Sequence, residues 1–119
     1  MTVDADDVGA ANNYADSLVS LERFEETKVL LRKTIPVARR VLGERNERTI
    51  KMRWTYAEAL CRADGATLGD LREAVTTLED AGRIARRVLG GAHPITGWVE
   101  ASLHNARASL HTREAFAKR

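Results

Sequence analysis

Apolar residues recur at steps of three or four along five stretches of the chain, separated by short polar or glycine-containing segments. This spacing places the apolar side chains on one stripe of an α-helix, so each stretch is predicted to be an amphipathic helix. The fourth stretch has the most regular stripe, formed by Leu71, Ala74, Val75, Leu78, Ala81, Ala85, Val88 and Leu89. The five predicted helices cover approximately residues 4–20, 24–42, 47–62, 68–89 and 94–117.

Glycine and proline mark several of these limits. Gly43 and Gly90 follow the second and fourth stretches, where glycine often adopts the left-handed conformation that closes a helix. Pro94 suits the first turn of the last helix, because that position needs no backbone donor. Pro36 lies inside the second stretch, and we expect a kink there because proline removes a backbone donor and strains the preceding turn.

The chain contains an internal duplication. The six residues Ala38–Gly43 are repeated letter for letter as Ala85–Gly90. Earlier in each unit, Tyr14 corresponds to Tyr56. The tyrosines are 42 positions apart and the six-residue blocks 47 positions apart, so the second unit holds five extra residues, which we place in the loop at 64–70. An internal duplication with a period of 42 to 47 residues is typical of a repeat architecture.

We therefore predict one all-α domain over residues 1–119, built as a solenoid of antiparallel helix pairs. Its parts are a first unit at about 4–43, a second unit at about 47–90 and a C-terminal capping helix at about 94–117. A single helix pair cannot bury both of its faces, so neighbouring units must stack and the last helix must cover the exposed end.

Composition supports a helical globular protein. The chain is 44% hydrophobic and 30% charged, with 5% aromatic residues and only 2 prolines. Its net charge is +2 with both signs interspersed, which favours a solvated helical surface. No apolar run approaches the roughly 20 residues that span a bilayer, and the acidic start is unlike a signal peptide. The single cysteine, Cys61, cannot form an internal disulfide, so we expect a cytoplasmic protein.

Three short motifs resemble those of a known repeat family. The segment Val88–Thr96 reads VLGGAHPIT, Val41–Thr49 is a variant of it, and Ala11–Ala15 reads ANNYA. These segments are similar to the tetratricopeptide repeat of the kinesin-light-chain type, in which Val-Leu-Gly is followed by His-Pro and a threonine. The resemblance implies a right-handed superhelix whose first helices line a concave groove, and a non-catalytic module that binds a peptide or extended protein segment.

The family's groove positions fall on polar and aromatic residues of this chain. Both tryptophans of the protein are among them, and an aromatic platform flanked by amide and guanidinium groups suits peptide recognition. The alternative is that the two tryptophans merely pack on each other between helices. The peptide-binding groove implied by the resemblance comprises Asn12, Asp16, Lys51, Trp54, Glu58, Arg62, Trp98 and Asn105.

Two adjacent-arginine pairs suggest a competing function. Arg39-Arg40 and Arg86-Arg87 could track phosphates, which favours a nucleic-acid binder. Each pair, however, lies in the last turn of its helix, where the helix dipole favours cations by about 0.3–1 kcal/mol. We therefore prefer the capping interpretation for both pairs. A second alternative is a structural role, as a self-associating repeat fragment of a longer array or a homo-oligomer joined through repeat ends.

Catalytic motifs are missing from the sequence. His104 and His111 are seven positions apart, which does not suit the paired metal ligation that a spacing of four allows. Phosphate loops and nucleophile elbows are likewise not found, and an inert, buried thiol is the expected state of Cys61. We predict no enzymatic activity, cofactor, metal or small-molecule substrate, and partners that are proteins or peptides, with no membrane and with nucleic acid as the less favoured partner.

Overall fold

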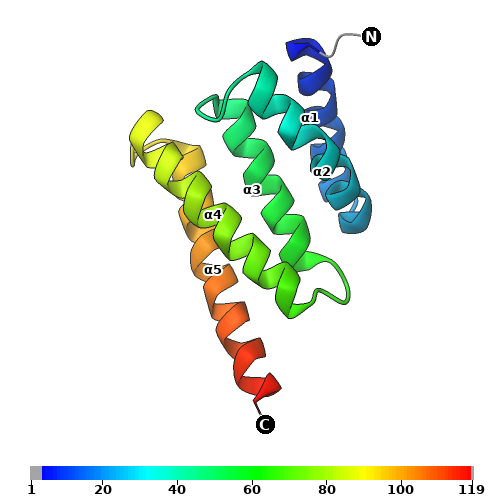
Figure 1. Ribbon diagram of the computed structural model, residues 1–119, viewed down its shortest axis with the longest axis vertical. Coiled ribbons are helices and arrows are strands. Elements are labelled where there is room, and N and C mark those ends of the chain that lie inside the picture. Colours follow the sequence, from blue (N-terminus) through cyan, green and yellow to red (C-terminus); the bar gives the residue numbers. More distant parts are fainter. Residues whose placement is uncertain (1–3, 119) are drawn as a thin grey trace.

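A computed structural model describes residues 4–118, and this part of the chain folds into five α-helices (Figure 1). Every helix begins and ends within one residue of the limits predicted from the apolar spacing, and the all-α fold class is confirmed. The helices are α1 (Ala5–Ser20), α2 (Phe24–Val41), α3 (Glu47–Arg62), α4 (Leu68–Val88) and α5 (Pro94–Ala117).

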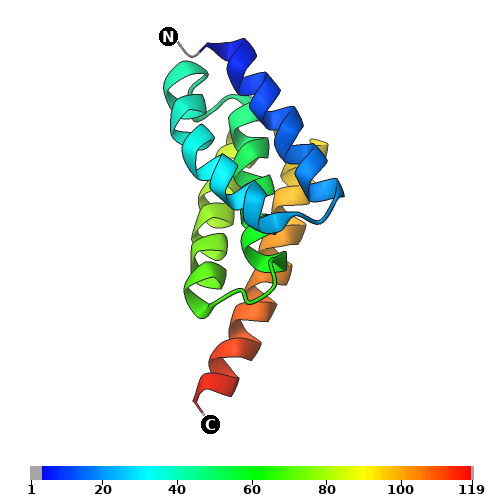
Figure 2. The same ribbon diagram turned by 90° about the vertical axis from the view of Figure 1, so that its right-hand side faces the viewer.

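The helices are arranged in two layers. In Figure 2, α1, α3 and α5 form one layer, and α2 and α4 form the other. Each helix packs against the next in the chain, and α3 also packs against α1 and α5. The molecule is elongated, with extents of 51 × 30 × 22 Å. This is the stacking that a helical-repeat solenoid requires, because each helix pair buries its open face on the next.

Side-chain caps define where most of the helices begin. The carboxylate of Asp4 accepts from the backbone N–H groups of Asp6 and Asp7 at the start of α1. Asn46 accepts from the backbone N–H of Arg48 at 2.8 Å before α3. His93 Nδ1 accepts from the backbone N–H of Ile95 at 3.1 Å before α5. Such bonds satisfy amides that have no partner within a helix, so these short polar residues fix the limits of each helix.

The predicted glycine caps are present. Gly43 has a φ of 90° and Gly90 a φ of 92°, and their backbone N–H groups donate to the carbonyls of Ala38 and Ala85 at 3.2 Å. A side chain at such a φ is strained, which explains why both repeats end in glycine. Pro36, by contrast, does not end its helix, since α2 continues through it to Val41.

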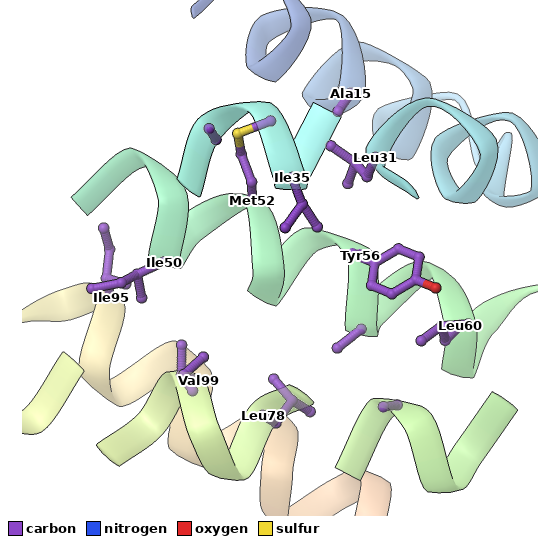
Figure 3. Close-up of a cluster of buried hydrophobic side chains, with 14 of the residues drawn as sticks. Ala15, Leu31, Ile35, Ile50, Met52, Tyr56, Leu60, Leu78, Ile95 and Val99 are labelled. Carbon is purple, nitrogen blue, oxygen red and sulfur yellow. The ribbon is translucent and has the colours of Figure 1, made fainter. Parts of the chain in front are cut away.

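The core runs between the two layers. In Figure 3, Leu31 and Ile35 approach α3 from one side and Leu78 approaches it from the other. Most of the predicted stripe of α4 is buried, but Val88 is 39% exposed, so its assignment to the core was wrong. Val88 is the last residue of α4, where the chain turns towards α5 and no helix covers it.

Candidate functional site

The two tryptophans meet on the layer formed by α1, α3 and α5. Trp54 projects from α3 and Trp98 from α5, and their rings stack with centroids 5.3 Å apart and an angle of 30° between planes. Trp54 is half-buried, whereas Trp98 remains 46% exposed. The rings therefore do pack on each other, as the competing interpretation holds, and Trp98 still presents a large apolar surface to solvent.

A short hydrogen-bonded chain fixes the orientation of Trp54. Its indole Nε1 donates to Ser102 Oγ at 2.8 Å, and that hydroxyl donates to Glu58 Oε1 at 2.6 Å. Because the indole has only one polar donor, this donor is not available to a ligand in the observed arrangement. Ser102 was not among the residues predicted from the sequence. It lies one helical turn after Trp98 and one turn before Ala106, so the helical spacing places it on the same side of α5 as Trp98.

An ion pair links the first two helices of this layer. Lys51 Nζ lies 3.2 Å from Asp16 Oδ2, which joins α3 to α1. Their side chains are 32% and 39% exposed, so the pair is screened by solvent and contributes only about 0–1 kcal/mol. These two residues, both among the predicted groove residues, supply one charge of each sign between α1 and α3.

Arg62 lies at the far end of α3. Its guanidinium carbon is 4.7 Å from the ring centroid of Phe24, a cation–π arrangement, and its Nη1 is 4.0 Å from Glu58 Oε2. Glu58 thus lies between the Ser102 hydroxyl and the Arg62 guanidinium. The carboxylate and the two neighbouring donors form a continuous polar border beside the tryptophan pair.

The remaining predicted residues differ in accessibility. Asn12 is only 7% exposed, and its Oδ1 accepts no hydrogen bond from residues 4–118. It lines a pocket of about 450 Å³ between α1 and α3, together with Leu42, Asn46, Glu47, Arg48 and Lys51. Asn105 on α5 is exposed. Asn12 therefore lies at the wall of a pocket, whereas Asn105 lies open on the surface.

The adjacent cysteine has the environment of an unreactive thiol. Cys61 is half-buried, and burial, with a smaller contribution from Glu58, raises its pKa to about 11. A thiol with such a pKa is protonated at neutral pH, whereas nucleophilic cysteines have lowered values. Within the described part of the chain, no three His, Cys, Asp or Glu side chains gather in a way that would hold a metal ion.

One arginine of each repeated block, and the nearby Arg83, pairs with an acidic residue. Arg39 Nε lies 3.5 Å from Glu44 Oε1, and Arg86 Nη2 lies 2.9 Å from both carboxylate oxygens of Glu100. Arg83 pairs with Asp80 at 3.0 Å, as its position one turn away suggests. Cations that are paired in this way favour the interpretation of these residues as part of a solvated helical surface.

Comparison with known proteins finds a similarity in the N-terminal part of the chain. Residues 8–47 match the family model of the tetratricopeptide repeat. The matched segment contains most of α1, all of α2 and the connection to α3. No curated protein and no solved structure matches the chain. Residues 8–47 are therefore similar to a tetratricopeptide repeat, and the all-helical fold is compatible with an array of such repeats; tetratricopeptide repeats generally mediate protein–protein interactions and are typically non-catalytic. Among the described helices, none has the length and apolarity to cross a membrane.

Proposed function

We propose that this chain is a non-catalytic cytoplasmic module that binds an extended peptide along α1, α3 and α5. The observation that carries the proposal is Trp98, which remains 46% exposed while it rests on the half-buried ring of Trp54. An aromatic ring supported from behind loses little conformational freedom on binding. Such rings are the residues that most often dominate binding energy at interfaces.

The surroundings of the tryptophan pair suggest how such a ligand is held. The exposed face of Trp98 is suited to an apolar side chain of the ligand. Asn105, exposed and two turns further along α5, offers an amide that can pair with a peptide backbone. The indole donor of Trp54 is already bonded to Ser102, so in this account Trp54 supports the platform and makes no polar contact with the peptide.

Charges of both signs flank the platform. Lys51 and Asp16 lie on one side, and Glu58 and Arg62 on the other. Since the charges alternate, they favour a ligand of mixed charge and disfavour a long run of one sign. The motif at Val88–Thr96 supports the finer proposal that these repeats are of the kinesin-light-chain type.

Intrinsic fluorescence gives a direct test, because both tryptophans of the protein lie at the proposed site. Peptides are selected from a random display library against the purified chain, and each is titrated while tryptophan emission is recorded. Trp98→Ala is expected to weaken binding of the selected peptides by at least about tenfold, the loss typical of an interface anchor.

The matched control is Val29→Ala, which truncates a residue of the other layer that is 54% exposed. Binding of the same peptides to this variant is expected to stay within about twofold of the parent. Because Trp98→Ala removes one of the two tryptophans, affinities of the parent and both variants are compared with a fluorescent label on the peptide in place of tryptophan emission. Unchanged affinity in Trp98→Ala would remove the tryptophan pair from the binding site.

A further inference from the structure

The contact of α2 with the second repeat unit is made by one strip of α3 and its C-cap residue. Met52, Tyr56, Ala59 and Ala63 follow the spacing i, i+4, i+7 and i+11, which places them on one side of a helix, and all four are buried. In Figure 3, Met52 points from α3 towards α2. This strip is therefore the surface on which the second helix of the preceding unit packs.

A polar contact lies at the centre of the strip. Tyr56 Oη accepts from Arg32 Nε on α2 at 2.9 Å and donates to Glu73 Oε2 on α4 at 2.5 Å. Arg32 Nη2 also lies 3.7 Å from Glu73 Oε1. The tyrosine thus holds together an arginine from the preceding unit and a glutamate from its own unit. A helix docking on this strip needs apolar side chains and an arginine in register with the tyrosine.

The same strip recurs on α5. Forty-seven positions after the residues of α3 stand Val99, Leu103, Ala106 and Leu110. Val99 and Ala106 are fully or almost fully buried, and Leu103 and Leu110 are half-buried. The helix that covers them is α4, which approaches so closely that a methyl group on Gly82 would lie 3.5 Å from Val99 Cγ1. The apolar part of the contact therefore recurs at both places within the chain. The arginine–tyrosine contact is specific to α2 and α3, because α5 has Leu103 in place of Tyr56 and α4 has Glu79 in place of Arg32.

On α1 and its C-cap residue, the equivalent strip is not covered by any of residues 4–118. It lies 42 positions before the residues of α3, a register that also aligns the helix-capping residues Asp4 and Asn46. Tyr14 is 54% exposed where Tyr56 is 6% exposed, and Leu21 is 65% exposed where Ala63 is 5% exposed. The strip on α1 comprises Ala10, Tyr14, Ser17 and Leu21.

We propose that this strip of α1 binds an amphipathic α-helix supplied from outside residues 4–118, packed as α2 packs on α3. Its apolar side chains would occupy the places that Leu31 and Ile35 take beside Tyr56. An arginine next to the first of them would donate to Tyr14 Oη, as Arg32 does to Tyr56. The strip thus continues the interface that already joins the units.

Charge supports a basic partner helix. The helix α1 contains Asp6 and Asp7 in its first turn and no lysine or arginine, and its third carboxylate, Asp16, is paired with Lys51. Glu26, which corresponds to Glu73 in the repeat register, is held by Arg23 at 2.8 Å. The incoming arginine would therefore lie near Glu26, as Arg32 lies near Glu73.

A second copy of the chain is a poorer occupant. The helix with the required pattern, α2, is already packed on α3. A second copy would have to open its own stack to supply it. The partner helix is therefore expected to come from another source, with the α2 pattern of apolar and arginine positions.

The test uses a peptide of residues 24–42 as the incoming helix. Val29→Glu in the peptide allows a lactam with Lys33, one turn later on the exposed side of α2, which holds the peptide helical. Fluorescence anisotropy should show saturable binding to the whole chain. Tyr14→Ser in the protein, or Arg32→Ala in the peptide, should weaken it by about tenfold, the loss typical of a charge-assisted hydrogen bond.

Two protein variants serve as controls. Val29→Ser removes an equally exposed apolar residue outside the strip, and Trp98→Ala alters the proposed peptide groove; binding of the helix should be unchanged in both. Failure of the groove proposal would thus leave this result intact. Absence of saturable binding, or binding that ignores Tyr14→Ser, overturns the inference. Concentration-dependent dimerisation that Tyr14→Ser abolishes also overturns it, in favour of a second copy.

Discussion

The stacked rings of Trp54 and Trp98, with centroids 5.3 Å apart, join the second repeat unit to the last helix. The hydrogen bond from Trp54 to Ser102 makes the same connection, so α5 is held to α3 by an aromatic contact and a polar contact at one place. The proposed binding surface therefore depends on the position of α5. Any change that loosens this helix should affect both stability and binding.

The stacking energy can be measured by a double-mutant cycle. Trp54→Ala, Trp98→Ala and the double variant are unfolded in urea, and their free energies of unfolding are compared with the parent. Stacked aromatic pairs contribute about 0.5–1.5 kcal/mol beyond burial, so the two substitutions are expected to be non-additive by that amount. Additivity within error would show that the rings are neighbours without mutual stabilisation.

The helix-ending glycines should be sensitive to any side chain. Gly43→Ala and Gly90→Ala are each expected to lower the free energy of unfolding by about 1–2 kcal/mol, because alanine is strained at a φ near 90°. Gly97→Ala is the matched control: Gly97 lies within α5, and an added methyl would meet no atom within 4 Å. There the substitution should stabilise the protein by about 0.5–1 kcal/mol. Equal effects at all three positions would contradict the capping geometry.

Buried Arg53 should make stability depend on Asp80. Arg53 Nη2 lies 2.5 Å from Asp80 Oδ2, and the Arg53 side chain is 5% exposed. Asp80→Asn is therefore expected to lower the free energy of unfolding by about 1–3 kcal/mol, since it leaves a buried cation without its counter-ion. Glu79→Gln is the control, because Glu79 pairs with exposed Arg107 and should change stability by less than about 1 kcal/mol.

The same ion pair predicts a pH dependence. The hydrogen bond from Arg53 holds the pKa of Asp80 below its usual 3.8. A carboxyl with a lowered folded-state pKa contributes stability that is complete above its unfolded pKa and is lost as pH falls through the folded value. Urea unfolding from pH 6 to 2.5 should therefore show the gap between the parent and Asp80→Asn closing below about pH 3.8. A gap that is constant over this range would argue against the ion pair.

The thiol of Cys61 should react slowly. Its pKa of about 11, against a usual 9.0, means about 100-fold less thiolate in the folded chain at pH 8. Reaction with a disulfide reagent should be at least about 100-fold slower for the folded protein than for the urea-unfolded chain. Equal rates would show that the thiol is not protected by the fold.

The sequence predicted the helices well, because local signals define them. These signals are the apolar periodicity, the helix-ending Gly43 and Gly90, and capping residues such as Asn46. Each of them depends only on residues within one or two helical turns. The repeat register also indicated that Trp54 and Trp98 share a surface. Trp98 is equivalent to Lys51, which lies one turn before Trp54 on the same face of α3.

Side-chain burial and hydrogen bonds that depend on neighbouring helices could not be predicted from the sequence. The sequence did not indicate that Asn12 would be only 7% exposed and would line a pocket beside α3. Ser102 was missed because its role requires the indole of Trp54 to approach from another helix. Val88 carries the apolar pattern of α4, but the turn towards α5 leaves it exposed. In each case, the local pattern is the same whether or not another helix covers the residue.

The central claim is that an extended peptide binds along α1, α3 and α5 across the two tryptophans. The most direct test is to record backbone amide and indole NMR shifts of the isotopically labelled chain during titration with a display-selected peptide. The account predicts that the largest changes fall on the indole signals of Trp54 and Trp98 and on amides of α3 and α5 around Glu58 and Asn105. Changes confined to α2 and α4, with both indole signals unmoved, would contradict it.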